Sequence, residues 1–180
     1  MKAIEFEAKI TLINEWHILR LPSLVSAELP SRGMCMGKLT IGSVSALIPI
    51  EPDGEKGHWI HIHPDLYTSV LSQIQENNSI QFQLTPTDQW LDPQIPEDIQ
   101  QALNVNSLSP TWAGLTAKAK WEWIRWIRFT NNPKTRDKRI NTAVDMLSSG
   151  KKRPCCFDQS RSTDMHVSRS GKLDYPSSND

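Results

Sequence analysis

The sequence has little of what identifies secreted or membrane-spanning proteins. Its 180 residues contain three cysteines, an odd number with two adjacent, which does not make a disulfide framework. No stretch approaches the roughly 20 apolar residues that a spanning helix needs. Apolar and charged residues alternate at the start, so the uninterrupted apolar core of a signal peptide is missing there. We therefore expect a soluble, cytoplasmic protein with no membrane span.

The sequence also lacks the common motifs that identify enzyme active sites. The eight glycines are scattered at turns and form no loop that could cradle a phosphate. There is no Gly-x-Ser-x-Gly elbow and no His-Glu-x-x-His metal motif. We therefore assign no catalytic residue, no cofactor and no metal site, and favour a protein that is not an enzyme.

Charge is plentiful but unevenly distributed along the chain. The formal net charge is zero, yet residues 1–117 hold six Lys and Arg against thirteen Asp and Glu. Residues 118–153 hold eleven Lys and Arg against three Asp and Glu. Such asymmetry indicates either an anionic partner for the basic segment or docking of the acidic and basic parts on each other. The second explanation is the more ordinary one.

The first 90 residues carry the patterns of strands. Apolar and polar residues alternate over 4–12, which is the period of a half-buried strand. Several short strands with turn signals between them favour a small barrel, because closure removes exposed sheet edges. The remaining strands are expected at 16–21, 34–41, 44–50, 58–63 and 79–85, and helices at 23–29 and 64–74.

The later part of the chain carries helical patterns. A helix expected at 116–130 is apolar over most of its circumference, so it should be contacted on more than one side. The next helix starts with Asn132 as its cap and Pro133 in its first position. It has one apolar face and should stop before Gly150.

These patterns predict an α+β fold. A small β-barrel is expected at 1–90 and a helical module at 94–158. From residue 159 apolar residues thin out among Ser, Asp and Arg, so we expect a flexible, disordered tail over 159–180.

Several motifs resemble a known family. In the helical part they are Trp-Glu-Trp-Ile-Arg-Trp-Ile at 121–127, Asn-Pro-Lys-Thr-Arg at 132–136, Arg-Ile at 139–140 and Gly-Lys-Lys-Arg-Pro-Cys-Cys-Phe at 150–157. These resemble the YdeI/OmpD-associated, or bacteriocin-protection, family. The first part is similar to a small β-barrel domain of unknown function often found ahead of it, through Pro-Ser-Arg-Gly at 30–33, Thr-Ile-Gly at 40–42, Pro-Asp-Gly at 52–54 and His-Trp at 58–59.

The resemblance implies a compact barrel, similar to the double-split barrels related to AbrB-type regulators, followed by a helical module. It also implies a loose association with bacterial tolerance of antimicrobial peptides. It brings no established catalytic residues. A third cysteine often seen shortly after the Cys-Cys pair is Ser162 here, which weakens a metal or redox interpretation of that end.

Basic residues are the main candidates for a functional surface. They could bind a protein or peptide partner, or neutralise the phosphates of a nucleic acid. No helix-turn-helix, zinc-finger or aromatic RNA-binding signature accompanies them. The candidates are Arg125, Arg128, Lys134, Arg136, Lys138, Arg139, Lys151, Lys152 and Arg153.

The tryptophans of the helical part could also offer a surface for stacking. Aromatic residues at helical spacing are more often core, and we expect Trp121 and Trp123 to be buried and Trp126 to follow the same pattern.

Two further groups could serve an enzyme. His61 and His63 face the same side of a strand, a spacing that zinc enzymes use, but no third ligand is tied to them in the sequence. Cys155 and Cys156 follow three basic residues, which would favour a reactive thiolate. They are not a Cys-x-x-Cys pair, however, and one cysteine packing beside Phe157 is the simpler explanation.

The leading hypothesis is a non-catalytic cytoplasmic binding protein of the YdeI/OmpD-associated type, in a setting of stress or antimicrobial-peptide tolerance. The basic helix and its border at 150–157 would be the contact surface. One alternative is a nucleic-acid-binding regulator that uses the basic helix at 133–153. The other is an enzyme with a site at His61 and His63 or at Cys155.

Overall fold

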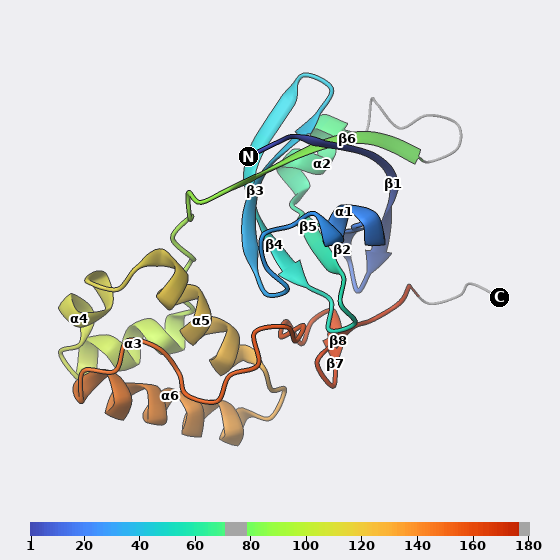
Figure 1. Cartoon of the computed structure of the whole chain (residues 1–180). Coiled ribbons are helices and arrows are strands. Elements are labelled where there is room, and N and C mark those ends of the chain that lie inside the picture. The colour runs from blue at the N-terminus through green and yellow to red at the C-terminus, as the bar shows by residue number, and fades with distance from the viewer. Residues whose placement is uncertain (71–78, 177–180) are drawn as a thin grey trace. The chain divides into compact units, whose positions relative to one another are not determined.

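The computed structural model describes residues 1–70 and 79–176, and the chain forms two compact units. The barrel unit contains residues 1–91, 159–162 and those from 166 onward. The helical unit contains residues 92–158 and 163–165. Figure 1 shows both units with their elements labelled.

The barrel unit is a closed, antiparallel six-stranded barrel, as expected. Its strands follow one another around the barrel in the order β1-β2-β5-β4-β3-β6. The helix expected at 64–74 is seen over Pro64–Val70 as α2, and the rest of that prediction lies outside the described residues. The elements are β1 (Ile4–Ile13), β2 (Trp16–Arg20), α1 (Ser23–Ala27), β3 (Cys35–Ile41), β4 (Val44–Pro52), β5 (His58–Ile62), α2 and β6 (Ser79–Thr87).

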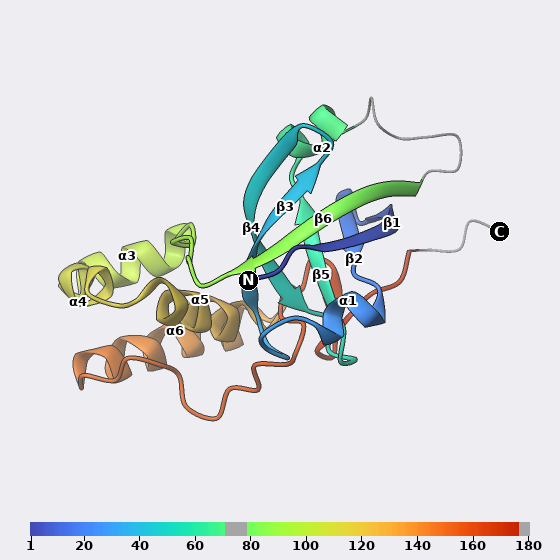
Figure 2. The ribbon, with the colours of Figure 1, turned by 45° about the horizontal axis from the view of Figure 1, so that its top comes forward.

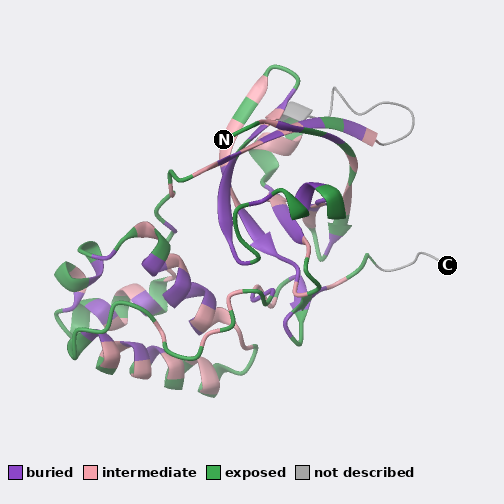
Figure 3. Cartoon of the chain, in the orientation of Figure 1, coloured by how far each residue is buried: buried purple, intermediate pink, exposed green. Residues whose placement is uncertain are grey.

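The barrel interior is built by the alternation along its strands. In β1 buried residues alternate with exposed ones at first, and Phe6 lies opposite Phe82 of β6 with the ring centroids 5.4 Å apart. Figure 3 shows this alternation along the strands. Strands β3 and β4 form a hairpin that turns at Gly42, whose φ of 56° glycine adopts without steric cost.

The helical unit consists of α3 (Glu97–Val105), α4 (Ser109–Ala113), α5 (Ala117–Arg128) and α6 (Pro133–Ser148). The Asn132 side chain accepts a hydrogen bond from the Thr135 amide at 3.2 Å, which confirms the expected cap. Gly150 follows the helix with a φ of 83°. The core includes Trp123 and Ile127, which are 0% and 1% exposed. In the described part of the chain, no helix has both the length and the apolar character needed to cross a membrane.

The expected flexible tail is wrong for residues 159–176. This segment forms a short hairpin of β7 (Ser168–Arg169) and β8 (Lys172–Leu173), seen in red in Figures 1 and 2. Val167 and Leu173 pack with Ile18 and Trp59 in a second apolar cluster beside the barrel core. The segment has few apolar residues, but these few cover apolar side chains of strands β2 and β5 that would otherwise be exposed.

Polar contacts hold the same segment to the barrel. The Trp59 indole N–H donates to Ser162 Oγ at 3.2 Å, and the Leu173 amide donates to the Asp53 carbonyl at 2.9 Å. A Cβ added to Gly54 would collide with the Gly171 carbonyl oxygen, so the close approach of the hairpin requires glycine there.

Candidate functional site

The basic candidates do not form one cluster. Helix α6 has 16 residues and is therefore about 24 Å long. Lys134 and Lys138 lie in its first turns, whereas Lys151 and Lys152 follow its C-terminal end. The basic surface is thus split between the two ends of the helix.

Arg136 is held within the helical unit by an acidic side chain. Its Nε and Nη2 atoms donate to the two carboxylate oxygens of Asp98, at 2.6 and 2.9 Å. This bidentate pair lowers the pKa of the Asp98 carboxyl and raises the pKa of the Arg136 guanidinium. The pair joins α6 to the first turn of α3, so its geometry has a structural explanation.

Arg139 donates hydrogen bonds to backbone carbonyl groups at the C-terminal end of the neighbouring helix, α5. Its Nη1 atom donates to the carbonyl oxygens of Trp126 and Phe129, at 2.7 and 2.8 Å. The last carbonyls of a helix lack partners within the helix, and Arg139 supplies a donor at the end of α5. The guanidinium also lies 5.6 Å from the centre of the Trp126 ring. Burial lowers the pKa of Arg139.

Three further arginines form contacts between α5 and the segment that follows α6. Arg128 forms an ion pair with Asp164 at 3.2 Å, and Arg153 forms one with Glu122 at 3.4 Å. Arg125 lies over the Phe157 ring at 5.3 Å and is only 1% exposed.

This burial corrects the prediction that Arg125 belongs to a contact surface. The side of α5 that carries Glu122 and Arg125 is covered by residues 152–157, so polar side chains there find partners inside the unit.

Four lysines stay at the surface after these pairings. They form no ion pair with any part of the chain that the structure describes, and each is exposed. Two of them are accompanied by Arg153, whose side chain is 56% exposed despite its pairing with Glu122. The four are Lys134, Lys138, Lys151 and Lys152.

The tryptophan prediction is confirmed most clearly for Trp123. This side chain is fully buried, and its indole N–H donates to the Lys152 carbonyl at 3.0 Å. It meets Trp126 edge to face, with ring centroids 6.0 Å apart. Trp121 and Trp126 are half-buried rather than buried. The tryptophans therefore act largely as packing groups.

His61 and His63 lie together on the barrel, as their spacing predicts, with ring centroids 4.2 Å apart. Trp16 stacks on His61 at 4.0 Å, and His166 of the C-terminal segment lies 4.7 Å from the same indole. Sequence spacing does not connect His166 with the pair, because 103 residues separate it from His63. Its docking follows from the packing of the C-terminal segment.

The environment of His61 favours a neutral imidazole. Burial, and then the neighbouring histidines, lower the pKa of His61 to about 4. Within residues 1–70 and 79–176, no three His, Cys, Asp or Glu side chains are grouped so as to hold a metal ion.

The cysteines fall into two environments. Cys155 and Cys156 are exposed free thiols, whereas Cys35 is buried in the barrel. Burial raises the pKa of the Cys35 thiol to about 12, which keeps it protonated and unreactive at neutral pH.

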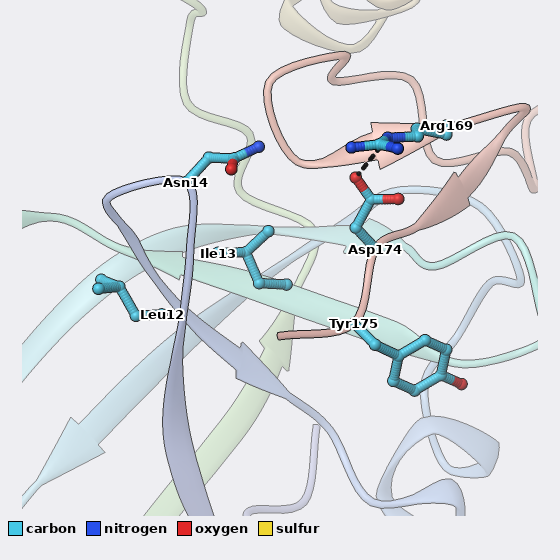
Figure 4. A pocket seen from close by; sticks show the side chains of 6 residues that line it. All are labelled: Leu12, Ile13, Asn14, Arg169, Asp174 and Tyr175. Carbon is cyan, nitrogen blue, oxygen red and sulfur yellow. Dashed lines mark ion pairs between the residues drawn. The ribbon is translucent and has the colours of Figure 1, made fainter. Parts of the chain in front are cut away.

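The barrel unit has a small hollow between the β1–β2 turn and the C-terminal segment. Its volume is about 200 Å³, and Figure 4 shows the residues that line it. Arg169 and Asp174 point toward each other there and form an ion pair at 3.4 Å. The Arg169 side chain is 83% exposed, and exposed pairs of this kind contribute little to stability or binding. Neither His61 nor Cys155 lines this hollow.

Two buried polar groups of the helical unit were not predicted from the sequence. Lys120 is 9% exposed, and its Nζ lies 3.1 Å from both carboxylate oxygens of Asp92. Trp112 is 4% exposed, and its indole N–H has no hydrogen-bond partner among the described residues. Ser109 followed by Pro110 is a typical helix start, and that signal could have identified α4 and with it Trp112.

Together, these features define a two-unit α+β protein that joins a closed six-stranded barrel to a helical unit with exposed lysines at both ends of its last helix. Residues 92–150 match the model of a family described as Bacteriocin-protection, YdeI or OmpD-Associated. The match covers α3 to α6 and confirms the resemblance seen in the motifs of the helical part. None of the curated proteins compared with the chain matches it significantly.

Proposed function

We propose that the protein is a non-catalytic binding protein of the YdeI/OmpD-associated type, whose helical unit contacts an acidic protein or peptide. The contact surface is the pair Lys151 and Lys152, with Arg153 beside them. The proposed setting is the cytoplasm, in stress or antimicrobial-peptide tolerance, and the family resemblance is what suggests the link to tolerance.

The observation that supports this proposal is the contrast between the arginines and the lysines. The arginines of the basic segment are engaged within the helical unit, whereas Lys151 and Lys152 are exposed and form no ion pair with the described residues. Adjacent exposed cations create a positive potential that attracts an anionic partner and accelerates its association. Their place after the C-terminal end of α6 also suits the negative end of the helix dipole.

An acidic polypeptide fits this surface better than a nucleic acid does. Bidentate phosphate recognition relies on arginine, and the Arg136 guanidinium is occupied by a carboxylate while Arg139 donates to backbone carbonyls. The exposed lysines remain as point charges at two separate places. A nucleic acid would need a continuous basic track to release many counterions.

The first experiment compares two double variants that remove the same charge at opposite ends of α6. A labelled Glu-rich peptide and a labelled duplex DNA are titrated with the protein, and fluorescence anisotropy is followed at increasing salt. Lys151→Gln with Lys152→Gln should weaken peptide binding by about three- to thirtyfold. Lys134→Gln with Lys138→Gln is the matched control and should leave binding nearly unchanged.

Equal losses in the two double variants would contradict the assignment of the surface, as would no peptide binding at low salt. Tight DNA binding that weakens steeply with salt would favour the nucleic-acid-binding regulator instead. The cellular setting is tested separately. Cells lacking the protein should become more sensitive to antimicrobial peptides, and the native chain should restore tolerance better than the Lys151 and Lys152 variant does.

A further inference from the structure

The helical unit contains a hollow that none of the preceding functions uses. It has a volume of about 320 Å³ and lies between α3, α4, the start of α5 and the extended segment that precedes α3. This volume falls at the lower end of the range of small-molecule sites. Its wall is formed mainly by the apolar side chains of Ile95, Leu103, Trp112 and Ala113.

One side of the hollow carries a buried cation whose counterion is exposed. The side chain of Lys120 is 11% exposed, whereas that of Asp92 is 66% exposed. A buried ammonium requires a paired anion, because the loss of hydration is costly. Asp92 lies in an extended segment just outside α3, so its carboxylate can move away and leave room for another carboxylate at the Lys120 Nζ.

The side chain of Trp112 lies in the same wall. The indole N–H of Trp112 is buried and has no acceptor within the described residues. An unsatisfied buried donor is uncommon and destabilises the free protein. The indole nitrogen is covered by protein atoms, so Trp112 contributes its ring, and not its N–H, to the wall of the hollow.

We propose that this hollow binds an amphipathic carboxylate. The apolar body of the ligand packs against Ile95, Leu103 and the Trp112 ring. Its carboxylate takes the place of the Asp92 carboxylate at Lys120. The chemistry fits two sources, which are a free medium-chain acid and the C-terminal carboxylate of a peptide that ends in an apolar residue. This site is independent of the lysines at 151 and 152.

The experiment uses the full chain and paired probes that differ in one group. Hexanoate is compared with hexanamide, and a short peptide ending in Leu is compared with its C-terminally amidated form. Binding is followed by calorimetry and by the NMR signal of the Trp112 indole. A free acid of this size should bind with a millimolar dissociation constant, and the amides should bind far more weakly.

Two variants test the geometry of the carboxylate site. Asp92→Asn removes the competing carboxylate and should tighten acid binding by about two- to fivefold. Lys120→Met keeps the aliphatic packing but removes the charge, and should weaken binding by about tenfold or more. Asp88→Asn, which changes an exposed carboxylate of the barrel unit, is the control and should have no effect.

The outcomes separate the two sources. Binding by hexanoate indicates a free acid, and binding only by the peptide with a free terminus indicates a chain end. The proposal is overturned if neither carboxylate binds, if acids and amides bind equally, or if Asp92→Asn weakens binding. The variants at 151 and 152 should bind the acids normally, so failure of the proposed protein contact leaves this test intact.

Discussion

Acidification should destabilise the barrel unit through His61. This ring is stacked on Trp16 and lies close to His63, and its pKa is lowered to about 4, first by burial. The ordinary pKa of a histidine, which applies to the unfolded chain, is 6.5. The unfolded state therefore binds a proton more readily than the folded state does. The stability that His61 contributes is fully present above pH 6.5 and is lost progressively as the pH falls toward 4.

The size of the effect follows from the two pKa values. Between pH 7.5 and pH 5 the free energy of unfolding should fall by at most about 2 kcal/mol on account of His61, and by less where solvent screens this partly buried ring. Burial also lowers the pKa of His58, which adds a loss in the same direction. A variant is therefore needed to isolate the contribution of His61.

The free energy of unfolding is measured by urea unfolding at pH 7.5 and at pH 5. Hydrogen exchange at the amides of β2 and β5 is measured separately at the same two pH values. Between the two pH values His61→Gln should lose less free energy of unfolding than the native chain, by at most about 2 kcal/mol, whatever its stability at pH 7.5. His63→Gln removes a neighbouring ring that adds to the lowering of the His61 pKa, so it should reduce the dependence on pH by a smaller amount than His61→Gln does. If the native chain and His61→Gln show the same dependence on pH, the argument from burial of His61 is refuted.

Three further predictions concern other parts of the chain. Gly54→Ala should loosen the C-terminal hairpin, because residue 54 has a φ of 79° and the new methyl group would meet a backbone carbonyl. Hydrogen exchange at β7 and β8 should become faster, and unchanged exchange would contradict the close approach. Asn132→Ala removes the cap of α6 and should cost about 1 kcal/mol in thermal or urea unfolding, whereas Asn132→Asp should cost much less. Brief treatment of the folded protein with iodoacetamide at neutral pH should leave Cys35 unmodified because burial raises its pKa to about 12, and intact-mass analysis should show at most two additions, at Cys155 and Cys156.

Local patterns predicted the elements of the fold well, because each depends on neighbours in the sequence. The alternation in β1 and the cap at Asn132 are of this kind. The C-terminal segment was predicted wrongly because its order comes from a few apolar residues that find partners far away in the chain. Val167 and Leu173 pack with Ile18 and Trp59, and no local sequence pattern predicts such a contact.

The candidate site was predicted by residue type but not by environment. Lysines and arginines of the basic segment look equivalent in the sequence. Only the three-dimensional structure distinguishes Arg125, which is buried beneath the segment after α6, from Lys151, which is exposed. Lys120 was counted in the basic segment, yet its pairing with Asp92 across 28 residues depends on the packing of α5 near the segment before α3.

The division of the chain between the two units has a consequence for its biosynthesis. Residues 159–162 and those from 166 onward complete the barrel unit, so that unit is not continuous in the sequence. About 100 residues separate β5 from β7, which corresponds to roughly 5–20 s of synthesis. During that interval Ile18 and Trp59 lack the cover of Val167 and Leu173. The emerging barrel unit therefore exposes the apolar side chains of Ile18 and Trp59 until residues 167–173 have been synthesised and have packed against them.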